Sequence, residues 1–189
     1  MQITTVLGPS FFVRTVYLSL VTEDELVEGA EFTDEKEEEL VDSGLCFGAE
    51  QKALDLLNRS EQYRLGLTSK LMKKGFDKFH INKALDYLES KKYLDDRRFA
   101  RVWLNARKIS HAEGRIRLQM ELASRGIDRD IIEDALDEYF SENDEEELCR
   151  RAYRKCIKIK KSSEKVTAYL LKCGFTIKLI EKVGKEFKG

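Results

Sequence analysis

Apolar residues recur at helical spacing on both sides of three glycines, Gly75, Gly126 and Gly174. Before each glycine stands a pair of apolar residues four positions apart: Leu67/Leu71, Leu118/Leu122 and Val166/Leu170. After each glycine a second apolar series follows: Ile81, Leu85 and Leu88, then Ile132, Leu136 and Tyr139, then Ile180, Val183 and Phe187. This spacing is typical of amphipathic helices, so it predicts one helix before and one helix after each glycine.

The residues around Gly75 are of the types found where one helix ends and the next begins. Glycine adopts the left-handed backbone past a helix end without steric cost, and Leu71 and Phe76 suit the apolar contact of a Schellman motif. Asp77 suits the N-cap of the next helix, and Phe76 can form a hydrophobic staple with Ile81. The same order returns as Leu122, Gly126, Ile127, Asp128 and Ile132, and as Leu170, Gly174, Phe175, Thr176 and Ile180. Three copies in register predict a tandem repeat.

A further apolar helix precedes each pair, over residues 53–57, 99–107 and 148–157, so each repeat is predicted to contain three helices. Asp95 is the predicted N-cap of the second of these helices, with Leu94 stapled to Phe99. Asn143 and Glu146 have the spacing of a capping box before the third. The predicted fold class is mainly α: an elongated tandem array of three three-helix repeats with a small N-terminal β-containing extension.

The N-terminal segment has a different pattern. Residues 11–18 are rich in aromatic and β-branched side chains and suit a strand or half of a hairpin. A turn is expected at Gly29, and Thr33 or Asp34 can open a helix towards Leu40. We therefore expect a small, weakly packed β element whose edges are exposed unless they pair. The predicted division is 1–48 for the acidic extension, then 49–94, 95–140 and 141–189 for the three repeats.

Charge is unevenly distributed, although the formal net charge of the 189 residues is only −1. Residues 1–48 contain two basic and eleven acidic residues, a net −9, whereas the remainder contains 32 basic and 24 acidic residues, a net +8. This asymmetry predicts a polyanionic or acidic partner for the helical part. The alternative is an acidic appendage beside an ordinary Lys-rich helical body.

Several function classes find no support in the sequence. Arg14 interrupts the N-terminal apolar stretch, and no apolar run reaches the roughly eighteen residues of a membrane span, so we expect a cytoplasmic protein that does not enter a membrane. Cysteines at 46, 149, 156 and 173 form no C-x-x-C motif, so reduced thiols packed in the core are expected. His80 is expected at the surface, beside the cap of its helix. No phosphate-binding loop, catalytic constellation or metal-ligand spacing is recognisable, so the sequence predicts no enzyme, metal or cofactor.

Basic residues gather in two clusters. The first contains Arg97, Arg98, Arg101, Arg107, Lys108, Arg115 and Arg117, and the second contains Arg150, Arg151, Arg154, Lys155 and Lys158, followed by Lys160 and Lys161. Like charges four residues apart on a helix cost a few tenths of a kcal/mol, which phosphates or carboxylates of a partner can offset. These residues are therefore the predicted partner- or DNA-binding surface, and a solvated basic face is the alternative. Trp103 is expected in the core with Phe99, and base stacking is its alternative role.

Residues 93–100, Tyr-Leu-Asp-Asp-Arg-Arg-Phe-Ala, followed by Trp103, Arg107, Gly114 and the turn at Gly126, resemble the central signature of the RecX regulatory family. The resemblance covers about residues 50–189. It implies a monomeric regulator that binds the filament of RecA recombinase on single-stranded DNA, in its groove, and suppresses recombinase, ATPase and coprotease activities in DNA repair, recombination and the SOS response. The third repeat departs from the others in having Thr176 and Gly184, so its last helix is expected to be less stable, and glycine alone costs about 1 kcal/mol.

Two other functions stay open from the sequence. One is a helical repeat protein that binds nucleic acid directly, without RecA. The other is a scaffold whose helices bind an unrelated protein.

Overall fold

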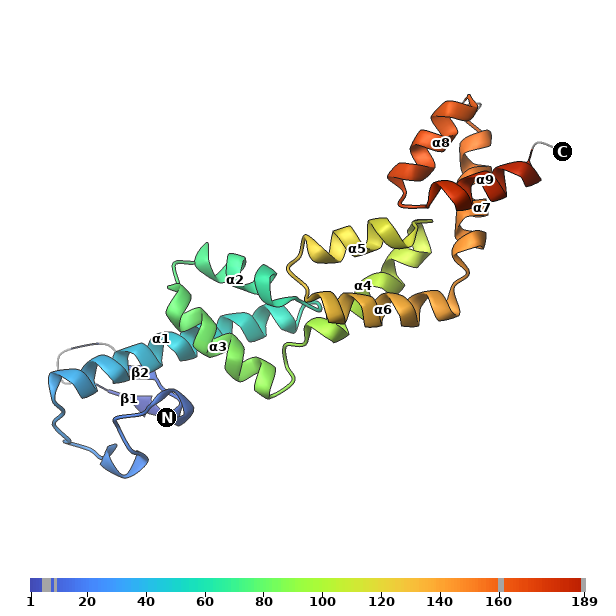
Figure 1. The fold of residues 1–189 in the computed structure, drawn as a ribbon. Helices are drawn as coiled ribbons and strands as arrows, with labels where there is room; N and C mark the ends of the chain where they lie inside the picture. The colour runs from blue at the N-terminus through green and yellow to red at the C-terminus, as the bar shows by residue number, and fades with distance from the viewer. Residues whose placement is uncertain (5–7, 9, 160–161, 188–189) are drawn as a thin grey trace. The chain divides into compact units, whose positions relative to one another are not determined.

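The computed structural model describes residues 1–4, 8, 10–159 and 162–187. Helices dominate these residues, as the sequence predicts (Figure 1). The elements are β1 (Gln2–Ile3), β2 (Phe11–Phe12), the 3-10 turns η1 (Thr15–Tyr17) and η2 (Glu23–Glu25), α1 (Asp34–Leu57), α2 (Arg64–Met72), α3 (Lys78–Ser90), α4 (Asp96–Ser110), α5 (Arg115–Ala123), α6 (Arg129–Glu142), α7 (Glu145–Ile157), α8 (Ser163–Lys172) and α9 (Ile177–Glu186). Three three-helix repeats, α1–α3, α4–α6 and α7–α9, confirm the predicted fold class. Lys160 and Lys161 lie outside the described residues.

The chain forms two compact units, Met1–Asp95 and Asp96–Gly189. The first holds the extension and repeat 1, and the second holds repeats 2 and 3. Helix α1 runs without a break through residues 48 and 49, so one helix belongs to both the extension and repeat 1. The finer division of the chain into four segments stays a prediction.

The three glycine turns have the predicted geometry. Gly75, Gly126 and Gly174 have φ of 91°, 73° and 88°, which is the left-handed region. In the first turn the Phe76 N–H donates to the Leu71 carbonyl at 3.3 Å, and the Gly75 N–H donates to the Met72 carbonyl at 3.0 Å. Both bonds recur in the other two turns, so each is a Schellman motif.

All three predicted N-cap residues after these glycines occupy the N-cap position, but only two of them accept a capping hydrogen bond. Asp128 accepts a hydrogen bond from the Asp130 N–H, and Thr176 accepts one from the Leu179 N–H. Asp77 occupies the N-cap position of α3, but its side chain makes no capping hydrogen bond. The threonine of the third repeat therefore caps its helix, whereas the aspartate of the first does not.

The core of the first unit lies between the three helices of repeat 1. Ala53 of α1, Leu67 and Leu71 of α2, and Ile81 and Leu85 of α3 are fully buried in one cluster. These are the positions that the apolar spacing predicts to face inward. Phe76 packs against the same cluster, so the residue after the turn glycine helps to fix where α3 starts.

The N-terminal extension is more firmly packed than the sequence indicates. β1 and β2 pair antiparallel, with Gln2 opposite Phe12, but the predicted strand over residues 11–18 stops after Phe12 and turns into η1. The strand residues themselves are exposed or half-buried, so the β element is as weakly packed as the sequence predicts. The firm packing begins after β2, where Val13 and Tyr17 are buried. The reason is a set of anchors distant in sequence. The Tyr17 hydroxyl donates to the buried carboxylate of Glu50 on α1 at 2.9 Å. The Arg14 guanidinium donates to the same carboxylate twice, at 2.6 and 2.8 Å.

A second carboxylate of α1 fixes the loop after η1. Glu39 accepts hydrogen bonds from the backbone N–H groups of Ser19, Leu20 and Val21 at 2.6, 2.8 and 2.9 Å. Partial burial opposes ionisation of this carboxyl, but the hydrogen bonds from Ser19, Val21 and Leu20 outweigh it and lower the pKa of Glu39 to about 2.

Two local predictions are wrong. His80 is buried rather than at the surface, because its Nε2 lies 2.9 Å from Asp42 of α1. Asn143 does not cap α7: Asp144 does, accepting from the Glu146 N–H, while Asn143 ends α6 by donating to the Tyr139 carbonyl at 2.6 Å. His80 has its partner on another helix, and Asn143 has its partner one turn earlier in α6. The spacing of residues in the sequence does not identify either partner.

Repeats 2 and 3 make a close backbone contact. The Gly114 N–H, just before α5, donates to the Cys173 carbonyl at the end of α8 at 2.8 Å. A Cβ on Gly114 would lie 2.4 Å from the Gly174 carbonyl oxygen, and a Cβ on Gly174 would lie 2.3 Å from the Arg117 nitrogen. Any side chain at either position would separate the two backbones.

Candidate partner-binding surface

The arginines of α4 face a row of carboxylates on α6. Arg97 donates to Asp134 at 2.6 Å and Arg101 forms an ion pair with Glu138 at 2.7 Å. The acids are four residues apart, as the arginines are, so the repulsion expected along α4 is offset within the protein. These pairs are exposed and contribute at most about 1 kcal/mol each, so a partner can displace them at low cost. Arg98, on the same helix, is half-buried.

Arg115, the first residue of α5, ties that helix to α6 and α7. Its guanidinium contacts Glu133 at 2.9 Å and Asp137 at 2.6 Å on α6, and its backbone N–H donates to Glu145 at 2.8 Å. Partial burial opposes the charge, but the hydrogen bonds that the guanidinium donates to Glu133 and Asp137 outweigh it and raise the pKa of Arg115. Arg115 is therefore a structural residue as well as a predicted contact.

The same link exists in repeat 1, where Arg64 opens α2 and contacts Asp86 of α3 at 2.7 Å. Arg64 and Arg115 each stand eleven residues before their turn glycine, and Asp86 and Asp137 each stand eleven residues after it. In repeat 3 the two positions hold Ser163 and Lys185, so this pair cannot form there. Aligning the repeats on their glycines would have revealed this feature in the sequence.

Glu113 is the buried centre of an ion-pair network. It is 7% exposed and accepts from Arg107 at 2.6 and 3.0 Å and from Arg117 at 2.7 Å. The hydrogen bonds to Glu113 raise the pKa of Arg107. Arg117 also lies 3.7 Å from Glu121 and donates to the Lys172 carbonyl of repeat 3 at 2.9 Å. Of the two predicted contact residues in this network, Arg117 thus links repeat 2 to repeat 3, whereas Arg107 pairs with Glu113 inside repeat 2.

Trp103 is half-buried rather than in the core, and two arginines lie over its ring. Arg107 and Arg125 are 5.0 and 4.8 Å from its ring, within cation–π distance. The ring is therefore occupied by neighbouring guanidinium groups, which does not suit stacking on a nucleic-acid base.

The arginines of repeat 3 are also engaged. Arg150 pairs with Glu146 and Glu147 of α7, and it also pairs with Glu186 of α9 at 2.8 Å. Arg154 pairs with Glu147 at 3.2 Å. Arg151 donates to the carbonyls of Lys108 and His111, so it is a further link between repeats 2 and 3.

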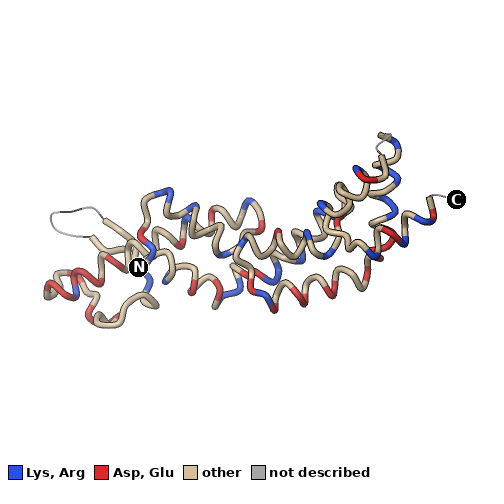
Figure 2. The backbone as a smooth tube through the Cα atoms, turned by 45° about the horizontal axis from the view of Figure 1, so that its top comes forward, with Lys and Arg blue, Asp and Glu red and all other residues tan. Residues whose placement is uncertain are grey.

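Three predicted contact residues stand apart from this pairing. Over the described part of the chain, no ion pair involves Lys108, Lys155 or Lys158. Figure 2 shows the wider pattern: acidic residues dominate the start of α1, whereas both signs are interspersed along α4 to α9. Positive charge free to meet a partner is thus carried mainly by lysines, whereas the arginines already have partners.

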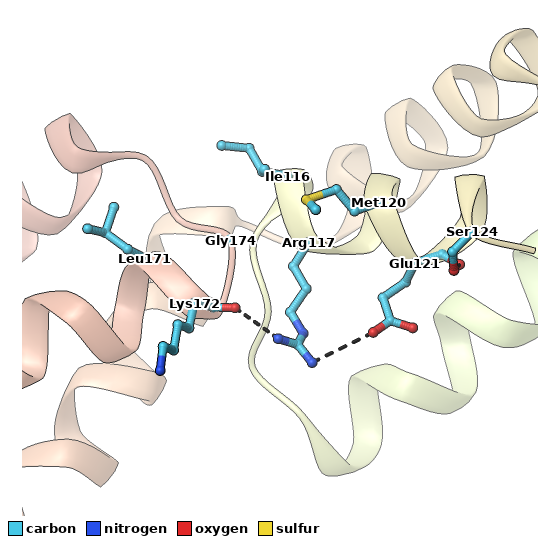
Figure 3. A pocket seen from close by; sticks show the side chains of 8 residues that line it. All are labelled: Ile116, Arg117, Met120, Glu121, Ser124, Leu171, Lys172 and Gly174. Carbon is cyan, nitrogen blue, oxygen red and sulfur yellow. Dashed lines mark hydrogen bonds and ion pairs between the residues drawn. The ribbon is translucent and has the colours of Figure 1, made fainter.

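Two hollows lie where repeat 2 meets repeat 3. One has a volume of about 540 Å³ and brings together Arg117, Arg151, Lys155 and Lys172, with Glu113 as its carboxylate. The other, of about 470 Å³, is a groove between α5 and α8 (Figure 3). Ile116, Met120 and Leu171 line the groove, and Gly174 lies between its walls. Lys172 and the groove were missed in the sequence because they depend on how two repeats pack.

The cysteines have the predicted place in the core. Cys46, Cys149, Cys156 and Cys173 are all buried and free. Burial raises the pKa of Cys46 and of Cys149 to about 11, so both thiols stay protonated at neutral pH. Within the described ranges no group of three or more His, Cys, Asp and Glu residues is arranged to hold a metal ion. No helix of that part of the chain has both the length and the apolar character to cross a lipid bilayer.

Comparison with known proteins identifies relatives that match two thirds or more of the chain. Residues 95–136 match the family model described as RecX, second three-helix domain. The chain is 40% identical over 127 residues to the regulatory protein RecX of Treponema pallidum (strain Nichols), which covers 67% of this chain and 77% of that protein. It is 30% identical over 155 residues to the regulatory protein RecX of Caldanaerobacter subterraneus subsp. tengcongensis, covering 82% and 78% of the two chains.

Two solved structures share the fold. A crystal structure of regulatory protein RecX superposes with a TM-score of 0.75 at 19% identity, over 86% of this chain and 83% of that one. The crystal structure of RecX from Lactobacillus salivarius superposes with a TM-score of 0.65 at 21% identity, over 76% and 97% of the two chains.

Proposed function

Because this chain belongs to the RecX family of regulatory proteins, we propose that it binds the filament of RecA recombinase on single-stranded DNA, in the groove of that filament. Binding there inhibits strand exchange, ATP hydrolysis and coprotease activity. Family membership is the observation that carries this proposal, because the matched segment, residues 95–136, is the central repeat with its arginine-rich α4 and α5.

The structure supports a binding protein that acts through many weak contacts. Tandem repeats present side chains over a long stretch of chain, and contacts spread over several sites add up to high avidity. Lys108, Lys155 and Lys158 can meet phosphates or carboxylates directly. Arg97 and Arg101 can exchange their exposed ion pairs for those of a partner.

The other predicted properties follow from the same proposal. The protein works as a monomer in the cytoplasm, where the filament forms, and regulates by occupying the filament rather than by chemistry of its own. Residues of both predicted basic clusters form the contact surface, with lysines making the direct charge contacts and most arginines holding the repeats in place.

The affinity for the filament, compared with the affinity for bare DNA, distinguishes this proposal from the alternative of a protein that binds nucleic acid directly. The experiment measures binding of the protein to fluorescein-labelled oligo(dT), alone and coated with RecA in the presence of a non-hydrolysable ATP analogue, over a range of salt concentrations. Weak binding to bare DNA with strong retention on the filament is expected. Equally tight binding to both, falling steeply with salt, would instead show a protein that acts directly on DNA.

A pair of variants tests the lysine contacts within this assay. Lys155→Gln/Lys158→Gln removes two charges that have no ion pair in the described structure, and weaker filament binding is expected. The matched control, Lys73→Gln/Lys74→Gln, removes two exposed lysines at the end of α2, so its net charge equals that of the Lys155→Gln/Lys158→Gln variant. Equal loss in both variants would show that overall charge, and not this surface, sets the affinity.

A further inference from the structure

The groove between α5 and α8 exposes apolar side chains that the fold itself does not cover. Ile116, Met120 and Leu171 are 47%, 67% and 48% exposed, and all three line the groove. Figure 3 shows Ile116 and Met120 on α5 and Leu171 on α8, with Gly174 between the two helices. Exposed apolar side chains gathered around a hollow are a mark of interaction sites, whereas scattered ones are ordinary.

The spacing of the two walls is set by two hydrogen bonds to backbone carbonyls of repeat 3. The Gly114 N–H bonds to the Cys173 carbonyl at 2.8 Å, and the Arg117 guanidinium bonds to the Lys172 carbonyl at 2.9 Å (Figure 3). These contacts join α5 to the end of α8 on one side of the groove. The groove is therefore formed before a partner arrives, so little ordering is needed on binding.

Positive charge surrounds the apolar walls. Arg117 and Lys172 line both this groove and the neighbouring hollow, which adds Arg151 and Lys155. The nearby carboxylates are already engaged: Glu113 bonds to Arg107 and Arg117, and Glu121 bonds to Arg125. Lys155 and Lys172 have no ion pair in the part of the chain that the structure describes. A partner with a carboxylate at this position would therefore bind more favourably, because it would form an ion pair with one of these lysines.

The lining favours a protein segment over nucleic acid. None of the eight described residues that line the groove is aromatic, whereas single-stranded nucleic acid is usually bound by stacking its bases on aromatic rings. A phosphodiester backbone offers nothing to three apolar side chains. Met120 is flexible and polarisable, and such side chains adapt well to the apolar groups of a protein partner.

We infer that the groove between α5 and α8 is a docking site for a protein segment that presents an apolar side chain with a carboxylate next to it. The apolar side chain packs between Ile116, Met120 and Leu171, and the carboxylate meets Lys172 and Lys155. For the source of the segment the inference rests on the proposed function: it belongs to the protein component of the filament. The groove thus contributes affinity that does not depend on DNA phosphates.

Neutral substitutions test the apolar contact without changing charge. Ile116→Ser/Leu171→Ser removes two exposed side chains of the groove, so folding should be preserved, which circular dichroism and thermal unfolding verify. Repeat 1 supplies the matched control, because Leu65 and Met72 on α2 hold the equivalent positions relative to Gly75 and are 49% and 53% exposed. The control variant is Leu65→Ser/Met72→Ser, and the probe is RecA assembled on oligo(dT).

The groove variant should bind the filament about tenfold more weakly or worse, since truncating central apolar contacts usually costs at least this much. The control variant and the binding of both variants to bare oligo(dT) should be unchanged. Wild-type affinity of the groove variant for the filament would overturn the inference while leaving the proposed function intact. Equal loss in the control would also overturn it, by showing a general effect of surface hydrophobicity. Failure of the unmodified protein to bind the filament would overturn the proposed function itself.

The charge contact is tested separately with Lys172→Gln. Weaker filament binding with a shallower salt dependence is expected, whereas Lys73→Gln, at the equivalent position of repeat 1, should change neither. A Lys172→Gln variant that binds as tightly as the unmodified protein, with the same salt dependence, would remove the carboxylate from the inferred segment.

Discussion

Gly114 and Gly174 bring repeats 2 and 3 into backbone contact: a Cβ on Gly114 would lie 2.4 Å from the carbonyl oxygen of Gly174. Gly174 serves two purposes at once, because its φ of 88° ends α8 and its lack of a side chain admits α5. Gly75 has the same left-handed φ, yet a Cβ there would meet nothing within 4 Å. The third turn glycine is therefore constrained by packing as well as by conformation.

Gly114→Ala should destabilise the second unit by about 1–3 kcal/mol, because the new methyl group forces the two backbones apart. Urea unfolding followed by circular dichroism measures this directly. The same denaturation curve for the variant and the unmodified protein would show that the two repeats are not held in this contact in solution.

Arg115→Gln should lower stability by up to about 1 kcal/mol, since its pairs with Glu133 and Asp137 are partly exposed. Arg64→Gln, which removes the equivalent pair with Asp86, should have a similar effect on the first unit. Thermal unfolding compares the two. If neither variant lowered the midpoint of unfolding, the arginine–aspartate pairs that join α2 to α3 and α5 to α6 would not contribute to stability.

Gly184→Ala should stabilise the protein by about 1 kcal/mol, because Gly184 lies inside α9 and alanine is the better helix former. The added Cβ would meet the Tyr153 hydroxyl oxygen at 3.6 Å and its ring carbons at 3.7 and 3.9 Å, which is ordinary van der Waals contact. Thermal unfolding checks the prediction, and a lower midpoint would mean that Tyr153 packs more tightly against α9 than the structure shows.

Glu39→Gln should weaken the attachment of residues 19–21 to α1 by about 1 kcal/mol at neutral pH. The pKa of Glu39 falls from 4.5 to about 2 on folding, so its contribution is fully present above pH 4.5 and is lost as the pH falls towards 2. The stability difference between the variant and the unmodified protein should therefore shrink across that range. A difference that stays constant from pH 7 to pH 2 would exclude the charged carboxylate as its cause.

Local features of this fold are legible in the sequence, whereas contacts between helices are not. The turn at Gly126 is predictable because every residue that defines it, from Leu122 to Ile132, lies within eleven positions. His80 was misplaced because its partner, Asp42, lies 38 residues away on α1. The packing of helices decides such pairs, and a single sequence does not specify it.

The candidate surface shows the same division. Arg97 and Arg101 are like charges four residues apart, so the sequence predicts that a partner neutralises them, yet Asp134 and Glu138 already face them from α6. The sequence thus shows where basic residues are concentrated, and their role as a contact surface stays a prediction, but which of their charges are already paired depends on the fold. The groove formed by Ile116 and Leu171 was out of reach, since it exists only where α5 meets α8.

The measurement that tests the central claim most directly is ATP hydrolysis by RecA on single-stranded DNA with increasing amounts of this protein. We predict that hydrolysis falls and levels off, and that the inhibition persists when single-stranded DNA is added in excess, because the protein acts on the filament. Inhibition that excess DNA abolishes would point to competition for DNA instead. Unchanged hydrolysis at saturating amounts of the protein would contradict the account.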